Sequence, residues 1–288
     1  MLGYLHASTI MAPMLSDQHI AILGVGNMGR ALLGGLLRGQ DVAPEQVRVT
    51  RRDTQALDAL REEFPGLITT TDNAEAVQGA NIVILAIKPQ VVSEVIESIR
   101  EHLAPNTLVV SILAGITTES LRESLGQDIP VVRAMPNTPA LVDAGATAIA
   151  GGRYAEDIHV SRTRAIFEAV GSVEVLPERL MDAVTGLSGS GPAYVYMIIE
   201  ALTDGGVKQG LPRLQAFQLA AQTVFGAAKL VIETGRHPAI LRDEVTTPGG
   251  TAIAAVAELE HHGLRTMLIN AVATATKRSA ELSELNNS

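Results

Sequence analysis

Short apolar segments alternate with amphipathic ones over the first 176 residues. Residues 19–26 and 81–88 are runs rich in Ile, Val, Leu and Ala, which are typical of strands buried on both faces. Residues 27–38 repeat leucine at helical spacing. Further strands are predicted over 46–52, 67–71, 107–115, 129–135, 146–150 and 172–176, and further helices over 73–79, 91–102, 117–125 and 156–170. This alternation predicts an α/β Rossmann-like, doubly wound sheet whose ligands lie beyond the carboxyl ends of its strands.

The strand pattern ends at residue 177, and only helices are predicted beyond it, over 193–202, 212–234, 252–261 and 264–282. Residues 193–202 are apolar on nearly every side, which one subunit cannot easily cover, so a partner chain is expected to bury them. We therefore expect a Rossmann domain over 18–176 and an all-helical dimerisation and substrate domain over 177–288. Residues 1–17 are expected to be an extension or tag, disordered or weakly packed, and 283–288 a frayed tail.

Composition narrows the classes of function. Hydrophobic residues make up 47% of the 288 residues, and no apolar run reaches the roughly 18 residues of a membrane helix. The net charge of −9 argues against a nucleic-acid surface. The absence of cysteine excludes disulfides and thiolate chemistry, and no pattern of metal ligands is evident. The first residues lack the features of a secretory signal, so a cytoplasmic protein is expected.

The motif Gly-Val-Gly-Asn-Met-Gly at residues 24–29 follows the first strand and opens the first helix. In that context the glycines allow a tight turn and close approach of a pyrophosphate, and the helix N-terminus supplies N–H groups. A flavin site or a Rossmann turn without ligand is the alternative. Arg51 and Arg52 end the second strand, where arginine suits the 2′-phosphate of NADPH. Asp53 favours NADH instead, and a solvated strand end is a third interpretation.

Two glycine-rich stretches in the second half of the chain are candidate ligand sites. Residues 187–194 alternate serine with glycine before Pro192, which suits the start of a helix. Residues 246–251 place two glycines before a helix, which exposes N–H groups suited to a carboxylate or phosphate. A plain helix cap is the alternative in both places. In the first half, Lys88-Pro89 and Ala114-Gly115 fall at predicted strand ends, where a cofactor is expected.

Five motifs, in their order along the chain, resemble those of the pyrroline-5-carboxylate reductase family. They are Gly-Val-Gly-Asn-Met-Gly at 24–29, Ala-Ile-Lys-Pro-Gln at 86–90, Arg-Ala-Met-Pro-Asn-Thr-Pro at 133–139, Leu-Ser-Gly-Ser-Gly-Pro-Ala-Tyr at 187–194 and Thr-Thr-Pro-Gly-Gly-Thr at 246–251. The order and spacing match from about residue 19 to 282. The dinucleotide motif is generic, whereas the last two motifs in this order are highly specific.

The resemblance implies an oxidoreductase that reduces the C=N bond of L-1-pyrroline-5-carboxylate to L-proline with NADPH, or with NADH as an alternative. It implies a homodimer, often assembled into a ring of dimers such as a decamer, in which residues 246–251 of one subunit meet residues 188–192 of the other. Cofactor binding is assigned to Gly24, Gly26, Asn27, Met28, Gly29, Arg51, Arg52, Asn73, Ala86, Ile87, Lys88, Pro89, Ala114, Gly115 and Asn137. Substrate binding is assigned to Ser188, Gly189, Gly191, Pro192, Thr247, Gly249 and Gly250, and catalysis to Ser190 and Thr251.

The loop at 246–251 departs from the family pattern, which reads Ser-Pro-Gly-Gly, one residue, and then a Thr whose hydroxyl meets the substrate nitrogen. The corresponding positions here are Thr247 and Ala252. Three alternatives follow: Thr251 supplies that hydroxyl instead, turnover is low, or the preferred imine is a different one. The competing functions are an NADP-dependent enzyme of the hydroxyacid dehydrogenase type with Lys229 as its acid, another imine reductase, and a non-catalytic NADP-binding dimer.

Overall fold

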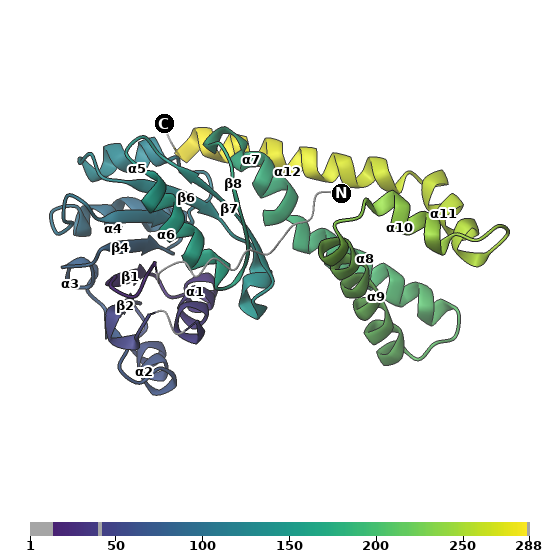
Figure 1. Ribbon diagram of the computed structural model, residues 1–288, viewed down its shortest axis with the longest axis horizontal. Coiled ribbons are helices and arrows are strands. Elements are labelled where there is room, and N and C mark those ends of the chain that lie inside the picture. The colour runs from purple at the N-terminus through teal and green to yellow at the C-terminus, as the bar shows by residue number, and fades with distance from the viewer. Residues whose placement is uncertain (1–13, 40–41, 287–288) are drawn as a thin grey trace. The chain divides into compact units, whose positions relative to one another are not determined.

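The computed structural model describes residues 14–39 and 42–286 and divides the chain into two compact units (Figure 1). The first, called here the sheet unit, runs through Gly189 and takes up the chain again from Thr276 onward. The second, the helical unit, is Ser190–Ala275. The strand pattern ends where the sequence predicts, but the units divide after Gly189 rather than at 177, because the first helical turns beyond the sheet pack on it.

The sheet unit contains one eight-stranded sheet. Its strands are β1 (Ile20–Leu23), β2 (Val47–Thr50), β3 (Ile68–Thr70), β4 (Ile82–Leu85), β5 (Leu108–Ser111), β6 (Val131–Met135), β7 (Gly145–Gly151) and β8 (Gly171–Val175). Their order is β3-β2-β1-β4-β5-β6-β7-β8. All neighbours pair in parallel except β6 and β7, which are antiparallel. The order reverses direction between β1 and β4, which is where ligands bind in doubly wound sheets.

Helices cover both faces of this sheet. They are α1 (Asn27–Arg38), α2 (Thr54–Glu63), α3 (Asn73–Val77), α4 (Val92–Ile99), α5 (Thr118–Leu125) and α6 (Asp157–Glu168). Because successive side chains of a strand point to opposite faces, Ile22 of β1 enters one half of the core and Leu23 the other. α1, α2 and α6 cover the first half, and α3, α4 and α5 the second. The double cover explains why the central strands are apolar without interruption.

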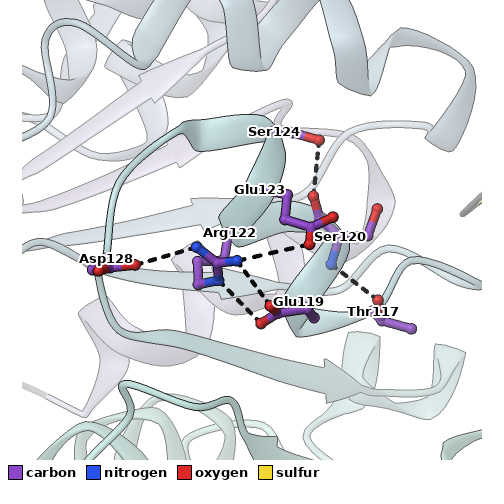
Figure 2. Close-up of polar contacts among 7 residues, drawn as sticks. All are labelled: Thr117, Glu119, Ser120, Arg122, Glu123, Ser124 and Asp128. Atoms are coloured by element: carbon purple, nitrogen blue, oxygen red, sulfur yellow. Dashed lines mark hydrogen bonds and ion pairs between the residues drawn. The ribbon is translucent and has the colours of Figure 1, made fainter.

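Helix α5 shows how local sequence fixes an element of this layer. Its N-cap, Thr117, accepts a hydrogen bond at Oγ1 from the Ser120 amide at 3.1 Å. On its exposed side, Arg122 donates to both carboxylate oxygens of Glu119 at 2.8 and 3.0 Å and to Asp128 at 3.2 Å (Figure 2). The hydrogen bonds from Arg122 lower the pKa of Glu119. Cap and ion pairs therefore come from one short segment of sequence.

The rest of the chain is helical, with α7 (Met181–Val184), a π-helical turn (Thr185–Gly189), α8 (Gly191–Lys208), α9 (Arg213–Thr234), α10 (Pro238–Val245), α11 (Thr251–His261) and α12 (Leu264–Asn286). α8 continues through Gly205 and Gly206 to Lys208, beyond the end predicted at residue 202. A Cβ on Gly206 would lie 3.2 Å from Ala216 Cβ, so glycine here serves the close packing of α8 on α9. Three helices, α2, α7 and α10, were not predicted.

The predicted boundaries at the two ends of the chain need correction. Residues 1–13 of the expected extension lie outside the described residues, but residues 14–17 are packed rather than disordered. Leu15 is buried in the core, and the Gln46 side chain donates to the Ser16 carbonyl at 2.5 Å. The expected frayed tail is helical up to Asn286. The hydroxyls of Ser279 and Ser283 donate to Asp182 Oδ1 at 2.7 and 3.1 Å, which fixes this end of α12 to α7.

Candidate active site

The turn between β1 and α1 depends on glycine at two positions. Gly24 has φ +86°, and a Cβ there would lie 2.6 Å from Ile87 Cγ2 and 2.8 Å from the Ala86 carbonyl oxygen. At Gly29 a Cβ would lie 2.8 Å from the Gly24 carbonyl oxygen. No other residue fits this backbone without displacing it. The glycines therefore bring the ends of β1 and β4 and the start of α1 into contact.

Gly26, between these two, faces open space. Nothing lies within 4 Å of the position that its Cβ would take, and no side chain caps α1, whose N-cap it is. The helix N-terminus therefore opens into a pocket of about 460 Å³. Eight of the predicted cofactor residues line this pocket: Gly24, Gly26, Arg51, Arg52, Asn73, Ala86, Ile87 and Lys88. The structure thus gathers residues from separate strand ends at one place.

Sequence reasoning missed other residues of the same pocket. Its lining also includes Val25, Thr50, Thr71, Val91, Glu94 and Val95. Thr50 Oγ1 donates to Asn73 Oδ1 at 2.8 Å, which holds that amide at the pocket. Glu94 lies in the first turn of α4, the helix that follows β4. Its place soon after Lys88-Pro89 was the available signal, but on sequence alone it is one more polar residue of an amphipathic helix.

The arginine pair at the end of β2 faces carboxylates in the structure. Arg51 donates from Nη1 to the Val25 carbonyl at 3.1 Å, and its Nη2 lies 3.9 Å from Asp53 Oδ2. Asp53, the residue that favours NADH on sequence grounds, is the N-cap of α2, and its side chain accepts from the Ala56 amide at 3.2 Å. Arg52 donates to both oxygens of Glu94, at 2.9 and 3.2 Å. The capping role of Asp53 accounts for a carboxylate next to two arginines.

Seven predicted cofactor residues do not line the pocket, namely Asn27, Met28, Gly29, Pro89, Ala114, Gly115 and Asn137. Asn137 uses both ends of its amide within the sheet unit. Its Oδ1 accepts from the Ala146 amide at 2.9 Å, and its Nδ2 donates to the Ser188 carbonyl at 3.0 Å. Asn137 therefore joins the start of β7 to the π-helical turn. This geometry gives it a positioning role for the segment that leads to Ser190.

The stretch at 187–194 is a π-helical turn that runs into α8. The Ser188 hydroxyl donates to the Val184 carbonyl at 3.2 Å. A Cβ on Gly189 would lie 2.9 Å from Met135 Cε, so the segment passes close to the end of β6. Ser190 is the N-cap of α8 and makes no side-chain cap, and Pro192 lies in the first turn, as the sequence predicts. π-Helical turns are rare in proteins as a whole, and those that occur are often found at functional sites.

The loop at 246–251 is exposed in the single chain. Gly249 has φ +70°, and the Gly250 amide donates to the Thr247 carbonyl at 3.0 Å. A Cβ on Gly250 would clash with Thr247 Oγ1 and lie 3.1 Å from the Thr247 carbonyl oxygen, so a larger residue here requires that hydroxyl to move. Thr251 is the first residue of α11, which has no side-chain cap. The helix N-terminus and Thr251 are therefore both open to solvent.

Lys229 and Glu200 lie on exposed helix surfaces. Lys229, the candidate acid of a dehydrogenase, has its Nζ 3.5 Å from Glu233 Oε1. Glu200 lies on α8, within the apolar stretch that a partner chain is expected to bury, and is exposed in the single chain, as are Tyr196 and Met197 beside it. Among residues 14–39 and 42–286, no group of three or more His, Cys, Asp or Glu could hold a metal ion. The same part of the chain contains no helix long and apolar enough to cross a membrane.

A glycine turn that opens a helix N-terminus onto the carboxyl ends of parallel strands is the arrangement by which Rossmann-type oxidoreductases hold the pyrophosphate of a dinucleotide. The fold and the pocket place the chain in that class. Comparisons with known proteins agree. Residues 19–115 match the family described as NADP oxidoreductase, coenzyme F420-dependent, and residues 178–282 match the family described as pyrroline-5-carboxylate reductase dimerisation.

Similar proteins extend over nearly the whole chain. A pyrroline-5-carboxylate reductase of Synechocystis sp. is 47% identical over 91% of this chain and 97% of its own length. A solved structure of the enzyme from Coxiella burnetii has a TM-score of 0.88 and 37% identity, covering 92% and 98% of the two chains. That of Plasmodium falciparum, solved with NADP bound, has a TM-score of 0.82 and 28% identity, covering 93% and 99%. The chain belongs to the pyrroline-5-carboxylate reductase family.

Proposed function

We propose that this chain reduces L-1-pyrroline-5-carboxylate to L-proline with NADPH, the last step of proline biosynthesis. The observation that carries the proposal is the pocket above the 24–29 turn in a chain of this family. No side chain covers the turn at Gly26, and a Cβ there would project into the open space where a pyrophosphate fits. NADPH supplies the hydride of the reaction when it is bound.

The residues that line the pocket suit NADPH part by part. The turn at Gly24 and Gly26 and the N-terminus of α1 bind the pyrophosphate, because N–H groups and a helix dipole favour negative charge. Arg51 and Arg52 bind the 2′-phosphate, since guanidinium pairs with phosphate in a bidentate manner. The amide of Asn73, with Ile87 and Lys88, borders the rest of the cofactor. NADH, which lacks the 2′-phosphate, binds more weakly.

The main requirement of the substrate is a set of hydrogen-bond donors for its carboxylate. We assign the carboxylate to the loop at Gly249 and Gly250, to the open N-terminus of α11 and to the Thr251 hydroxyl, with Thr247 beside them. The imine nitrogen takes its proton from solvent, so no strong side-chain acid is required, and catalysis rests on holding the two reactants in register. Ser188, Gly189, Ser190, Gly191 and Pro192 form the other wall of the site.

We propose that the two walls come from different subunits of a homodimer, which assembles further into a ring of dimers. Apolar side chains left exposed on the helical unit support this, because a monomer rarely exposes so many. The match of residues 178–282 to a dimerisation family supports it as well. The expected location is the cytoplasm. The dehydrogenase alternative loses support, because Lys229 is paired with Glu233 on an exposed helix face.

The direct test is to mix purified protein with pyrroline-5-carboxylate and either NADPH or NADH, and to follow the nicotinamide absorbance. Oxidation of the cofactor with formation of proline is expected, faster with NADPH. No oxidation with either cofactor would refute the proposal. Replacing Arg51 and Arg52 together by alanine should weaken NADPH by about 10-fold or more and NADH much less. Equal losses for both cofactors would contradict the role of the arginines.

A further inference from the structure

The two arginines at the end of β2 are held differently. Arg51 is tied to the backbone by its hydrogen bond to the Val25 carbonyl at 3.1 Å, and its Nη2 lies 3.9 Å from Asp53 Oδ2, beyond hydrogen-bond distance. Arg52 reaches instead to Glu94 in the first turn of α4, and its Nη2 lies 2.9 Å from Oε2 and 3.2 Å from Oε1. Arg52 and Glu94 both line the cofactor pocket. The guanidinium suited to a phosphate is therefore already occupied by a carboxylate of the same pocket.

This arrangement has a chemical consequence for one part of the cofactor only. A 2′-phosphate is doubly negative or nearly so and offers several acceptor oxygens to arginine, as the Glu94 carboxylate does. The two anions therefore compete for Arg52 and repel each other. The 2′-hydroxyl of NADH carries no charge, so it meets neither effect. The pyrophosphate is common to both cofactors and cancels in a comparison of the two.

We propose that Glu94 is a selectivity residue, which competes with the 2′-phosphate of NADPH for Arg52 and so keeps the preference for NADPH over NADH smaller than the two arginines alone would give. This inference rests on the proposed function, since it requires that the pocket bind a nicotinamide dinucleotide. The side chains of Arg52 and Glu94 are 76% and 72% exposed. Such an ion pair contributes little to folding, so it opens readily, and removing Glu94 leaves the fold intact.

The test compares dissociation constants for NADPH and NADH, measured by nicotinamide fluorescence or calorimetry, in the full-length protein and its E94Q variant. Glutamine keeps the size of the side chain and removes its charge. E94Q should bind NADPH about 3- to 10-fold more tightly and change NADH by less than about twofold. The gain for NADPH should shrink as salt is added, because the groups are exposed.

The helix that carries Glu94 provides a matched control. Glu97 lies one turn further along α4, does not line the pocket, and pairs with Arg100 at 2.8 Å. E97Q makes the same change in net charge and should leave both dissociation constants within about twofold. In an R52A background the effect of E94Q on NADPH should shrink, since the group for which the anions compete is then missing.

The outcomes separate this inference from the function on which it rests. If E94Q changes NADPH and NADH equally, or leaves both unchanged while wild type binds them, Glu94 is not a selectivity residue and the inference is wrong. If E97Q reproduces the gain, net charge and not competition at Arg52 is responsible, and the inference is again wrong. If wild type binds neither NADPH nor NADH, the proposed function itself fails. Circular dichroism of each variant establishes that it is folded.

Discussion

The two compact units differ in how they cover their apolar side chains. In the sheet unit, Ile22 and Leu23 of β1 are fully buried between two layers of helices. In the helical unit, Ile232 is 80% exposed and Met197 70%, and the described buried residues are three, Thr203, Ala216 and Ala220. The pocket for the cofactor lies wholly in the sheet unit. The sheet unit thus has a finished core, whereas the helical unit lacks one.

The difference between the two units separates cofactor binding from catalysis. The residues that line the proposed dinucleotide pocket come from one chain and are held by a packed core. The loop at 246–251, to which we assign the substrate carboxylate, lies on a unit whose apolar side chains are largely exposed in the single chain. Cofactor binding should therefore survive when assembly fails, and catalysis should not.

The largest effect is expected from breaking the apolar surface of the helical unit. Phe225 and Ile232 are seven residues apart on α9 and hence on one face of it, and they are 58% and 80% exposed. Replacing both by Asp should give a monomer and lower kcat/KM on the order of 100-fold, because charges oppose burial. The NADPH dissociation constant should stay within about twofold. Ultracentrifugation, steady-state kinetics and cofactor titration provide the three readouts.

The control for this experiment is Ile158→Asp, since Ile158 is 41% exposed on α6 of the sheet unit. It introduces a charge at an exposed apolar site of the other unit and should alter neither assembly nor turnover. A double Phe225/Ile232 variant that remains dimeric would show that this face of α9 is not buried on assembly.

The next largest effect concerns the glycine turn and separates binding from folding. Gly26→Val should weaken NADPH about 10- to 100-fold, because the side chain enters the open space of the pocket, while the melting temperature stays unchanged. Gly24→Ala should instead destabilise the fold by about 1–3 kcal/mol, since it combines a φ of +86° with contacts to Ile87 and Ala86. Titration with NADPH and thermal melts on both variants test the contrast. A stable Gly24 variant with full affinity would contradict it.

Asn137 connects the sheet to the segment that leads into α8, so its loss should affect turnover more than cofactor binding. Asn137→Ala removes the partners of the Ala146 amide and the Ser188 carbonyl, and kcat should fall about 5- to 10-fold. Asn137→Asp keeps the acceptor for Ala146 but sets a carboxylate against the Ser188 carbonyl. It should therefore be as poor as alanine. An Asp variant with wild-type kcat would show that the bond to Ser188 is dispensable.

A smaller effect is expected at Ala252, in the first turn of α11. Ala252→Thr should raise kcat about threefold or more, because a hydroxyl at this position is the family's usual contact to the substrate nitrogen. Ala252→Val has the same shape without the hydroxyl and should give no gain. If threonine and valine behave alike, or if threonine lowers the rate, the hydrogen bond to the ring nitrogen does not limit turnover here.

The smallest effect concerns pH and the surface of the sheet unit. Burial lowers the pKa of His159, and its Nδ1 accepts a hydrogen bond from the Glu156 amide at 3.0 Å. The pKa of His159 in the folded protein lies below the unfolded value of about 6.5. Neutral His159 therefore contributes to the free energy of unfolding above that value, and the contribution is lost as pH falls through the folded pKa. Between pH 8 and pH 5 the melting temperature should fall more for wild type than for His159→Gln. Equal falls would disprove the role of His159.

Much of the sheet unit could be predicted because its signals are local. Strands buried on both faces are apolar throughout, and the 24–29 motif stands directly between such a strand and a helix. The helix after β2 was missed, since α2 carries only Leu57 and Leu60 into the core. Leu15 was missed as well, because nothing in a short N-terminal segment reveals which residue the core will accept.

The pocket itself needed the structure, because its residues meet through tertiary contacts. The sequence assigns Asn73 to cofactor binding, but it does not reveal the hydrogen bond from Thr50 to the Asn73 side chain, which links residues 23 apart in the chain. Glu94 and Asn137 are two further residues whose contacts the sequence does not reveal. Glu94 has the sequence context of a surface residue of a helix and lines the pocket, whereas Asn137 belongs to a motif and serves the backbone of β7 and Ser188. Spacing along the chain predicts elements but not partners.

The attachment of α12 to Asp182 bears on how the protein is made. The sheet unit contains the segment from Thr276 onward, and Ser279 and Ser283 fix that segment in place. On the ribosome, N-terminal domains usually fold while the rest is still being synthesised. Here the first unit to emerge cannot be finished until the helical unit has been translated and the segment beyond it leaves the exit tunnel. A nonsense mutation ahead of Ser279 would therefore damage the cofactor-binding unit as well as the helix it shortens.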